Sequence, residues 1–150
     1  YFMKKILSFH TRLGWMTAIE QDGKIIELKF IKSKSEGQSL ILRRIKKNIN
    51  DFFSKKAKSF KIPCKIYGSD LQIRIWKELK KIPYGKTKSY GDIAKKVRTS
   101  PRYVGNVCGQ NKHLLIVPCH RVIRTDGSLG GYSSSGGLSL KKRLLKLEQQ

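Results

Sequence analysis

The sequence lacks any apolar run long enough to cross a membrane, and it contains few acidic residues and few cysteines. A transmembrane helix needs about 18 consecutive apolar residues, so we expect no membrane partner. The first residues, YFMKK, have neither the apolar core nor the small-residue cleavage site of a secretory signal. Only 10 residues are acidic whereas 33 are Lys or Arg, and the formal net charge is +23 at pH 7.

The three cysteines, Cys64, Cys108 and Cys119, are widely spaced and include no C-x-x-C pair. Disulfide frameworks and zinc sites use cysteines at short, paired spacings, so we expect no disulfide, no metal and no cofactor. A reducing, cytoplasmic compartment is the setting in which free thiols survive. Cys64 lies in an alternating stretch and Cys108 on an apolar helical stripe, which predicts packed side chains for both.

Positive charge is spread over the whole chain. Residues 1–66 hold 16 basic and 5 acidic side chains, and residues 67–150 hold 17 and 5. A polyanion is the natural partner of such a chain, because each contact with a phosphate releases condensed counterions. The alternative is that a lysine-rich composition reflects the base composition of the genome or a solvated surface.

Hydrophobic periodicity predicts an α+β fold with two domains. Residues 6–9, 15–20 and 25–30 read as strands, the last two flank a hairpin turn at Asp22-Gly23, and residues 40–53 read as an amphipathic helix. We therefore expect residues 1–66 to form a structural domain with a small antiparallel sheet and one helix. Residues 67–150 are expected to form a helical domain.

Start signals divide this second domain into helices. Ser69 or Asp70 can cap a helix that ends at Pro83 and buries Leu71, Ile75, Leu79 and Ile82, while Ser89 and Ser100-Pro101 begin two shorter helices. Two short helices joined by a tight turn form a helix-turn-helix. The glycine-rich residues 127–137 lack the spacing of a phosphate loop and predict a lid or a pocket wall. Ser139 is expected to cap a last helix over residues 140–149.

The segment that contains the candidate nucleophile follows the second of these short helices. Four apolar residues, Leu114 to Val117, precede Pro118, Cys119, His120 and Arg121. The apolar run predicts a buried strand that fixes the thiol in place, and a neighbouring basic group can hold it as the reactive thiolate. The alternative is that Cys119 is a small buried hydrophobic residue.

The motif VPCHRV, Val117 to Val122, resembles the active-site signature of the O6-alkylguanine-DNA alkyltransferases, also called methylated-DNA–protein-cysteine methyltransferases. The resemblance is clear from about Ile82 to Glu148 and weak over the first 66 residues. It implies a DNA repair enzyme that acts once, as a monomer. It also implies that residues 67–150 form a winged-helix-like domain that carries DNA binding and alkyl transfer. The enzyme moves an alkyl group from guanine O6, and from thymine O4, in double-stranded DNA irreversibly onto Cys119. The target base lies inside the duplex, so it has to be flipped out.

The resemblance also implies roles for individual residues. Cys119 is the nucleophile, His120 takes the thiol proton through a bridging water, and Glu148 orients the histidine ring. Asn111 ties the active-site turn to the helix-turn-helix, and Tyr90 donates a hydrogen bond toward the purine. Neighbours in an extended chain point to opposite sides, so no direct hydrogen bond between Cys119 and His120 is expected. The alternatives are a surface position for Glu148 and a purely structural one for Tyr90.

The remaining implied roles concern DNA and the substrate pocket. Arg102 matches the arginine that enters the minor groove and fills the gap left by the base, and Gly105 allows close approach of its helix. The full DNA-contact set is Tyr90, Ser100, Arg102, Tyr103, Gly105 and Arg121, and the pocket set is Leu114, Pro118, Val122, Tyr132 and Ser133. Two departures concern the pocket: Leu114 stands where some members have proline, and the Ser133–Ser135 run is longer than in some relatives.

Two other functions are compatible with parts of this pattern. A non-catalytic protein that binds alkylated DNA would have the same architecture, although relatives of that kind replace the cysteine that is present here. A Cys-His hydrolase would require an oxyanion hole, which the sequence does not mark.

Overall fold

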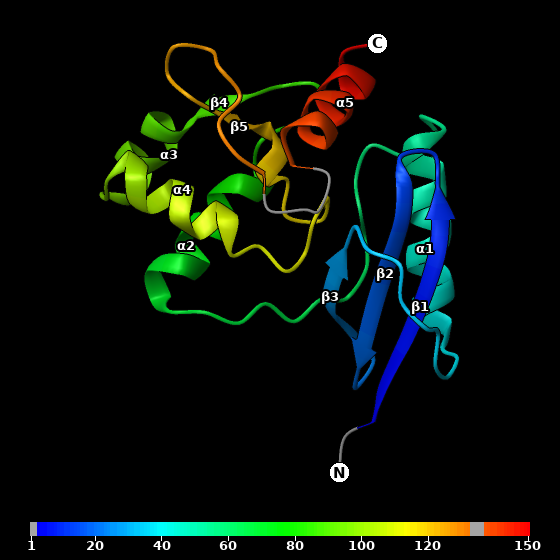
Figure 1. The fold of residues 1–150 in the computed structure, drawn as a ribbon. Helices are drawn as coiled ribbons and strands as arrows, with labels where there is room; N and C mark the ends of the chain where they lie inside the picture. The colour runs from blue at the N-terminus through cyan, green and yellow to red at the C-terminus, as the bar shows by residue number, and fades with distance from the viewer. Residues whose placement is uncertain (1–2, 133–136) are drawn as a thin grey trace. The chain divides into compact units, whose positions relative to one another are not determined.

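Strand patterning gives way to helical patterning after residue 66, and the computed structural model, which describes residues 3–132 and 137–150, divides at the same place. Its two units are Tyr1–Ile66 and Tyr67–Gln150. The first contains an antiparallel sheet and one helix, and the second contains four helices and a two-stranded parallel ladder (Figure 1). The predicted α+β fold class is confirmed. Within the described ranges, no helix is both long and apolar enough to pass through a bilayer.

The sheet of the first unit is a meander of β1 (Lys4–Thr11), β2 (Gly14–Gln21) and β3 (Lys24–Lys29). Its second turn is the expected hairpin, in which Asp22 and Gly23 have φ values of +59° and +77°. Positive φ at both central residues is the signature of a turn whose twist matches that of the flanking strands. The register of β2 and β3 shifts between Ile19 and Glu20, where a bulge interrupts the alternation.

Helix α1 (Leu40–Phe53) spans the predicted residues and contacts all three strands. Ser39 caps it by accepting a hydrogen bond from the Leu42 amide at 3.1 Å. Its buried side chains recur at helical spacing, which places them on the one stripe that faces the core. They are Leu42, Ile45, Ile49, Phe52 and Phe53.

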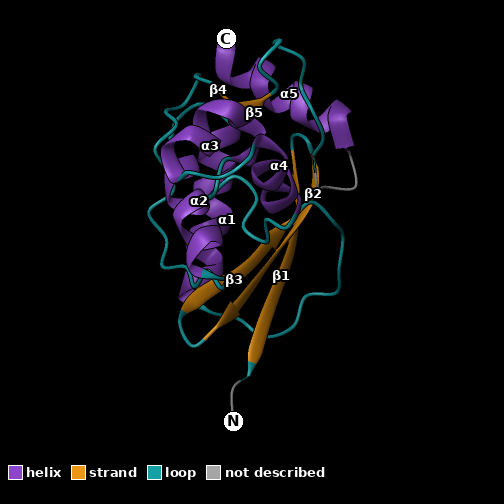
Figure 2. Cartoon of the chain, turned by 90° about the vertical axis from the view of Figure 1, so that its left-hand side faces the viewer, coloured by secondary structure: helices purple, strands orange, loops and turns teal. Residues whose placement is uncertain are grey.

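The second unit is built on α2 (Asp70–Lys80), α3 (Tyr90–Val97) and α4 (Pro101–Gly109), which contact one another and are grouped together in Figure 2. Ser69 and Ser89 each form a capping box with the residue three positions later. Helix α3 ends at Arg98, whose φ of +62° turns the chain into Ser100, the cap of α4. The predicted helix-turn-helix is therefore present.

A pair of two-residue strands, which the sequence did not predict, joins distant parts of the second unit. Lys88 and Ser89 (β4) pair in parallel with Val122 and Ile123 (β5). The ladder links the residue before Tyr90 to the segment that follows Cys119. Two residues are too few for any hydrophobic alternation to be visible.

The last helix, α5 (Gly137–Gln149), begins before its predicted start. Ser139 is therefore a residue of the first turn and not the cap. Leu140, Leu144 and Leu147 are buried, and Lys141 and Glu148 are buried with them. These two charged residues, at i and i+7, bring polar chemistry into the interior from the same face of the helix.

Replacing Phe52 tests the core of the first unit. Its ring is fully buried, with centroids 5.5 Å from Phe53 and 5.3 Å from Phe60. Phe52→Ala is expected to lower the free energy of unfolding by about 3–5 kcal/mol, because the site cannot collapse around the cavity. Urea denaturation followed by Trp15 fluorescence in a Trp76→Phe background measures this unit. Leu40→Ala, on the exposed side of α1, is the control, and equal losses would contradict the assignment.

Candidate functional site

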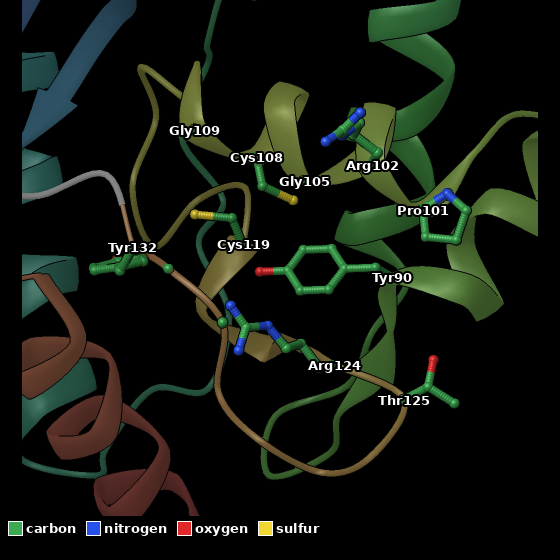
Figure 3. Close-up of a pocket in the computed structure, with 12 residues that line it drawn as sticks. Tyr90, Pro101, Arg102, Gly105, Cys108, Gly109, Cys119, Arg124, Thr125 and Tyr132 are labelled. Atoms are coloured by element: carbon green, nitrogen blue, oxygen red, sulfur yellow. The ribbon is translucent and has the colours of Figure 1, made fainter.

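A cavity of the second unit has a volume of about 690 Å³ and contains Cys119 in its wall. Figure 3 shows the Tyr90 ring in its centre, with Cys108 and Cys119 on one side and Arg124 on another. The lining combines the helix-turn-helix with the segment after β5. The described lining residues are Tyr90, Pro101, Arg102, Gly105, Cys108, Gly109, Cys119, Arg124, Thr125, Gly130, Gly131 and Tyr132.

Two consecutive turns, and not the predicted strand, deliver the thiol to this cavity. Leu114 to Val117 are buried as expected, but they form a tight turn in which Leu115 has a φ of +74°. Pro118, with φ −80° and ψ 64°, then forms an inverse γ-turn in which the Cys119 amide donates to the Val117 carbonyl at 2.8 Å. Proline is already close to this φ, so the 3₁₀ helix η1 (Cys119–Arg121) starts at a fixed point.

Asn111 connects the end of α4 to this turn. Its Nδ2 donates to the Val117 carbonyl at 2.8 Å and to Cys119 Sγ at 3.2 Å, and its Oδ1 accepts from the His113 amide at 2.8 Å. One buried amide thus fixes the turn at three points and supplies a donor to the sulfur. A donor at this position favours the thiolate over the thiol.

The thiol of Cys119 is protonated at rest. Only 3% of the residue is exposed, and burial raises its pKa to about 11, although the Asn111 hydrogen bond and the charge of Lys141 act in the opposite direction. The proton has to be removed during the reaction, which requires a base.

His120 has the properties of such a base. Its Nε2 lies 2.7 Å from Glu148 Oε2, and burial lowers the histidine pKa even though Glu148 opposes this shift. Because the carboxylate can only accept, Nε2 carries the proton and Nδ1 carries the lone pair. Nδ1 is buried without a hydrogen-bond partner among the described residues. A neutral imidazole therefore offers an unused proton acceptor within the site.

Glu148 is held in its ionised form. Arg121 donates to both carboxylate oxygens at 2.8 and 2.9 Å, and the Gly85 amide adds a bond of 3.2 Å. Burial alone would raise the pKa of Glu148, but the hydrogen bonds and charges of His120 and Arg121 outweigh it and lower the pKa to about 2. The carboxylate fixes both the ring orientation and the tautomer of His120.

Arg121 does not occupy the exposed position that DNA contact requires. Its guanidinium is buried, forms the bidentate pair with Glu148, and donates from Nη1 to the Ile82 carbonyl at 2.8 Å. All of these donors serve the interior of the unit. We therefore assign Arg121 to the support of Glu148 instead of the DNA-contact set.

Tyr90 stands at the first position of α3, where the Ser89 capping box fixes the start of the helix. Burial, followed by the charges that Cys108 and Cys119 would carry, raises its pKa to about 12, so the phenol remains a hydrogen-bond donor. Gly130, with a φ of +71°, approaches so closely that a Cβ there would lie 2.8 Å from the phenol oxygen. The tyrosine is thus part of the cavity and not only of the core.

The lid residues are described in part. Tyr132 lines the cavity, its hydroxyl is buried with no hydrogen-bond partner among the described residues, and burial raises its pKa. Ser133 lies outside the described residues.

The expected DNA-contact residues of the helix-turn-helix lie at the start of α4. Arg102 is exposed and lines the cavity, Gly105 faces Tyr90, and Tyr103 is half-buried. Ser100 Oγ accepts from the Tyr103 amide at 3.1 Å, so its hydroxyl serves as the helix cap. Arg102 is the member of this set that joins an exposed surface to the cavity.

Three residues expected in the pocket lie behind it. Leu114, Pro118 and Val122 are buried, and none of them lines the cavity. The sharp turn at Pro118 sends only the Cys119 side chain toward the open space. Their contribution is to support the wall.

Sequence reasoning missed three residues of this region. Cys108, placed in the apolar stripe of α4, also lines the cavity, and Arg124 lines its far side. Lys141 is completely buried beside them. The signal for Lys141 was its spacing of seven residues from Glu148, which places both on one face of a helix. Within residues 3–132 and 137–150, no cluster of three or more His, Cys, Asp or Glu is arranged to hold a metal ion.

Comparison with known proteins places this geometry in a family. Residues 70–150 match the family described as 6-O-methylguanine DNA methyltransferase, DNA binding domain. A protein of Metallosphaera sedula named methylated-DNA–protein-cysteine methyltransferase is 37% identical over 144 residues, covering 94% of this chain and 90% of that protein.

Solved structures agree over nearly the whole chain. The crystal structure of the Mycobacterium tuberculosis O6-methylguanine methyltransferase superposes with a TM-score of 0.87 at 31% identity, covering 98% of this chain and 93% of that one. A structure of Mycobacterium tuberculosis OGT in complex with DNA gives a TM-score of 0.85 at 31% identity, with coverage of 96% and 92%.

Replacing Glu148 tests the buried network. Glu148→Gln is expected to lower the free energy of unfolding by about 3–5 kcal/mol, because the guanidinium of Arg121 stays buried without its counter-charge. A carboxyl group with a pKa of about 2 in the folded protein and about 4.3 in the unfolded one stabilises the fold above about pH 4.3. That contribution disappears as the pH falls toward 2.

The measurement is chemical denaturation between about pH 6 and pH 2. The difference in stability between the parent protein and Glu148→Gln should shrink over the acidic part of this range. Glu78→Gln, a half-buried carboxylate of α2 that pairs with the exposed Lys81 at 2.8 Å, is the control for loss of one carboxylate. A difference that does not change with pH would contradict an ionised Glu148.

Proposed function

The chain belongs to the methylated-DNA–protein-cysteine methyltransferase family, and from this premise we propose that it repairs O6-alkylguanine in double-stranded DNA by taking the alkyl group onto Cys119. The observation that carries the proposal is a buried thiol in the wall of a cavity, next to a histidine whose Nδ1 has no hydrogen-bond partner among the described residues and whose pKa burial lowers. Transfer from O4-alkylthymine is included, since it requires the same displacement.

The reaction is a displacement at a saturated carbon. The sulfur lone pair of Cys119 forms the new bond to the alkyl carbon, the bond from that carbon to guanine O6 breaks, and its electron pair stays on the purine. No tetrahedral intermediate forms, so no oxyanion hole is needed. What the protein supplies is a thiolate, a pocket and stabilisation of the departing purine.

His120 supplies the thiolate. Its Nδ1 has no hydrogen bond in the described residues, so a single water can bridge it to the thiol and carry the proton across. The imidazolium that results is stabilised by Glu148, whose carboxylate lies 2.7 Å from Nε2. The carboxylate acts as the charge partner of His120 only while the ring is protonated. The ring is protonated in the transition state, where this stabilisation is needed.

Tyr90 serves the leaving group. The high pKa of its phenol, about 12, keeps the proton on oxygen, and the ring lines the cavity between Cys119 and Arg124 (Figure 3). A hydrogen bond from this hydroxyl to a purine nitrogen withdraws charge from the base as the carbon–oxygen bond breaks. The proton released by Cys119 finally balances the purine anion, which leaves as guanine.

The helix-turn-helix and the net charge of +23 support DNA as the partner. A guanine inside a duplex reaches the cavity only after it is flipped out, at a cost of a few kcal/mol. Arg102 stands at the exposed start of α4 and at the cavity, where its planar guanidinium can fill the vacated position in the stack. Unit Tyr67–Gln150 therefore carries both DNA binding and transfer.

Each molecule acts once and as a monomer. A thioether is a poor leaving group, and the second thiol of the cavity, Cys108, has a pKa that burial raises further, so it does not remove the alkyl group. Cys108 and Cys119 are free thiols, which suits a reducing, cytoplasmic setting.

Intact mass analysis tests the transfer. After incubation with duplex DNA containing O6-methylguanine, the protein should gain one methyl group, and peptide mapping should locate it on Cys119. Cys119→Ala should gain none, and Cys108→Ala is the matched control that should still react. An unmodified protein that binds this DNA would instead support a non-catalytic damage-binding function.

Replacing Arg102 tests base flipping. Arg102→Ala is expected to slow repair of duplex DNA by about tenfold or more, because about 1.4 kcal/mol of the flipping cost is no longer offset. Reaction with free O6-benzylguanine should change by less than about twofold, because a free base needs no extrusion. Arg102→Lys keeps the charge but not the planar group, and should stay slow on the duplex. Equal losses on both substrates would remove this role.

A further inference from the structure

Lys141 of α5 lies beneath the cavity with no exposed surface. Its Nζ donates to the Val122 and Leu129 carbonyls at 2.6 Å each and to the Gly131 carbonyl at 3.1 Å. The Tyr90 hydroxyl lies 3.4 Å away, and Nζ is 5.6 Å from the centre of the Tyr90 ring. The lysine thus fastens the segment after η1 to the helix that carries Glu148.

The geometry requires Lys141 to be charged. An ammonium has three donors and no acceptor, which three carbonyl oxygens satisfy. A neutral amine has only two donors, so its lone pair would face one of the carbonyls. Burial lowers the pKa of Lys141, but the charges that Cys119 and Cys108 would carry raise it.

This buried charge has no acidic partner. Among the ion pairs of the described residues, none includes Lys141. A buried charge without a counter-ion is costly, and carbonyl dipoles offset only part of that cost. The titratable and charged groups around it belong to four segments of the unit: Tyr90, Cys108, Cys119, His120 and Arg124.

We propose that Lys141 is a positioning residue whose ammonium is the counter-ion of the negative charge that forms on Cys119 and passes to the purine. The proposal rests on the alkyl transfer proposed above. Before the reaction the site holds one uncompensated positive charge and a neutral thiol. When the thiol proton moves to His120, the sulfur becomes the missing anion.

The negative charge then moves from the sulfur to the purine and stays close to the ammonium of Lys141. The lone pair of the sulfur forms the new carbon–sulfur bond. The electron pair of the broken carbon–oxygen bond stays on guanine O6 and places the negative charge on the purine. The purine lies against Tyr90, whose hydroxyl is already within reach of Nζ. Protonation of the purine by the proton that Cys119 gave up ends the sequence, and Lys141 keeps its own three protons throughout.

The test compares Lys141→Gln and Lys141→Met with Lys142→Gln. Lys142 is the next residue of α5 and is exposed, so its replacement removes the same charge from the helix but not from the cavity. The rate of alkyl uptake from free O6-benzylguanine is measured from pH 6 to pH 10. Iodoacetamide labelling of Cys119, followed by intact mass, gives a second profile that requires no purine.

Loss of the counter-ion should raise the pKa of the thiol by about one unit, equivalent to about tenfold less thiolate at a given pH below that pKa. In each assay, both Lys141 variants should therefore need a pH about one unit higher to react at the same rate as the parent protein. Lys142→Gln should react like the parent at every pH. Slower alkyl uptake from O6-benzylguanine with iodoacetamide labelling that is unchanged or faster would mean that Lys141 only supports the wall, and would overturn the proposal. A parent protein that takes up no alkyl group would contradict the proposed function instead.

A measurement on the parent protein keeps the proposal testable if both variants fail to fold. With ¹⁵N-labelled lysine, the Nζ resonance of Lys141 should show three attached protons at pH 7 and at pH 8. A two-proton amine at either pH would overturn the proposal, because a neutral lysine cannot serve as the counter-ion.

Discussion

The carboxylate of Glu148 is the constraint on which the rest of the site depends. It accepts hydrogen bonds from His120, Arg121 and Gly85, three residues that are far from it in sequence. These bonds fix the tautomer of the base and join α5 to η1 and to the loop after α2. Because a buried carboxylate is stable only when its acceptors are satisfied, the network either forms completely or leaves charges unpaired. Chemistry and folding of this unit are therefore coupled.

The buried nucleophile is an unreactive thiol at rest and becomes reactive when its proton is removed. A thiol with a pKa of about 11 is almost wholly protonated at neutral pH, and oxidation follows thiolate character and exposure. Cys119 is thus protected while the cavity is empty. Asn111 and Lys141 both favour the anion, and in the proposed reaction His120 takes the proton.

Periodicity and capping predicted much of the fold, because helices and hairpins are determined by local residues. Helix α1 matched its predicted range, and the Asp22-Gly23 turn had the expected positive φ values. The active-site turn could not be predicted, since a buried apolar run is compatible with a strand or with a packed turn. The buried position of Arg121 depends on a partner 27 residues away, which no local pattern reveals. The buried position of Lys141 was not predicted, because a lysine on a helix is usually solvated.

The distance in sequence between Cys119 and Glu148 has a consequence for synthesis on the ribosome. Translation produces the thiol well before it produces α5, and the nascent segment that contains Cys119 then lacks both the carboxylate that orients His120 and the ammonium of Lys141. The newly made chain becomes competent for chemistry in a single late step, when α5 docks.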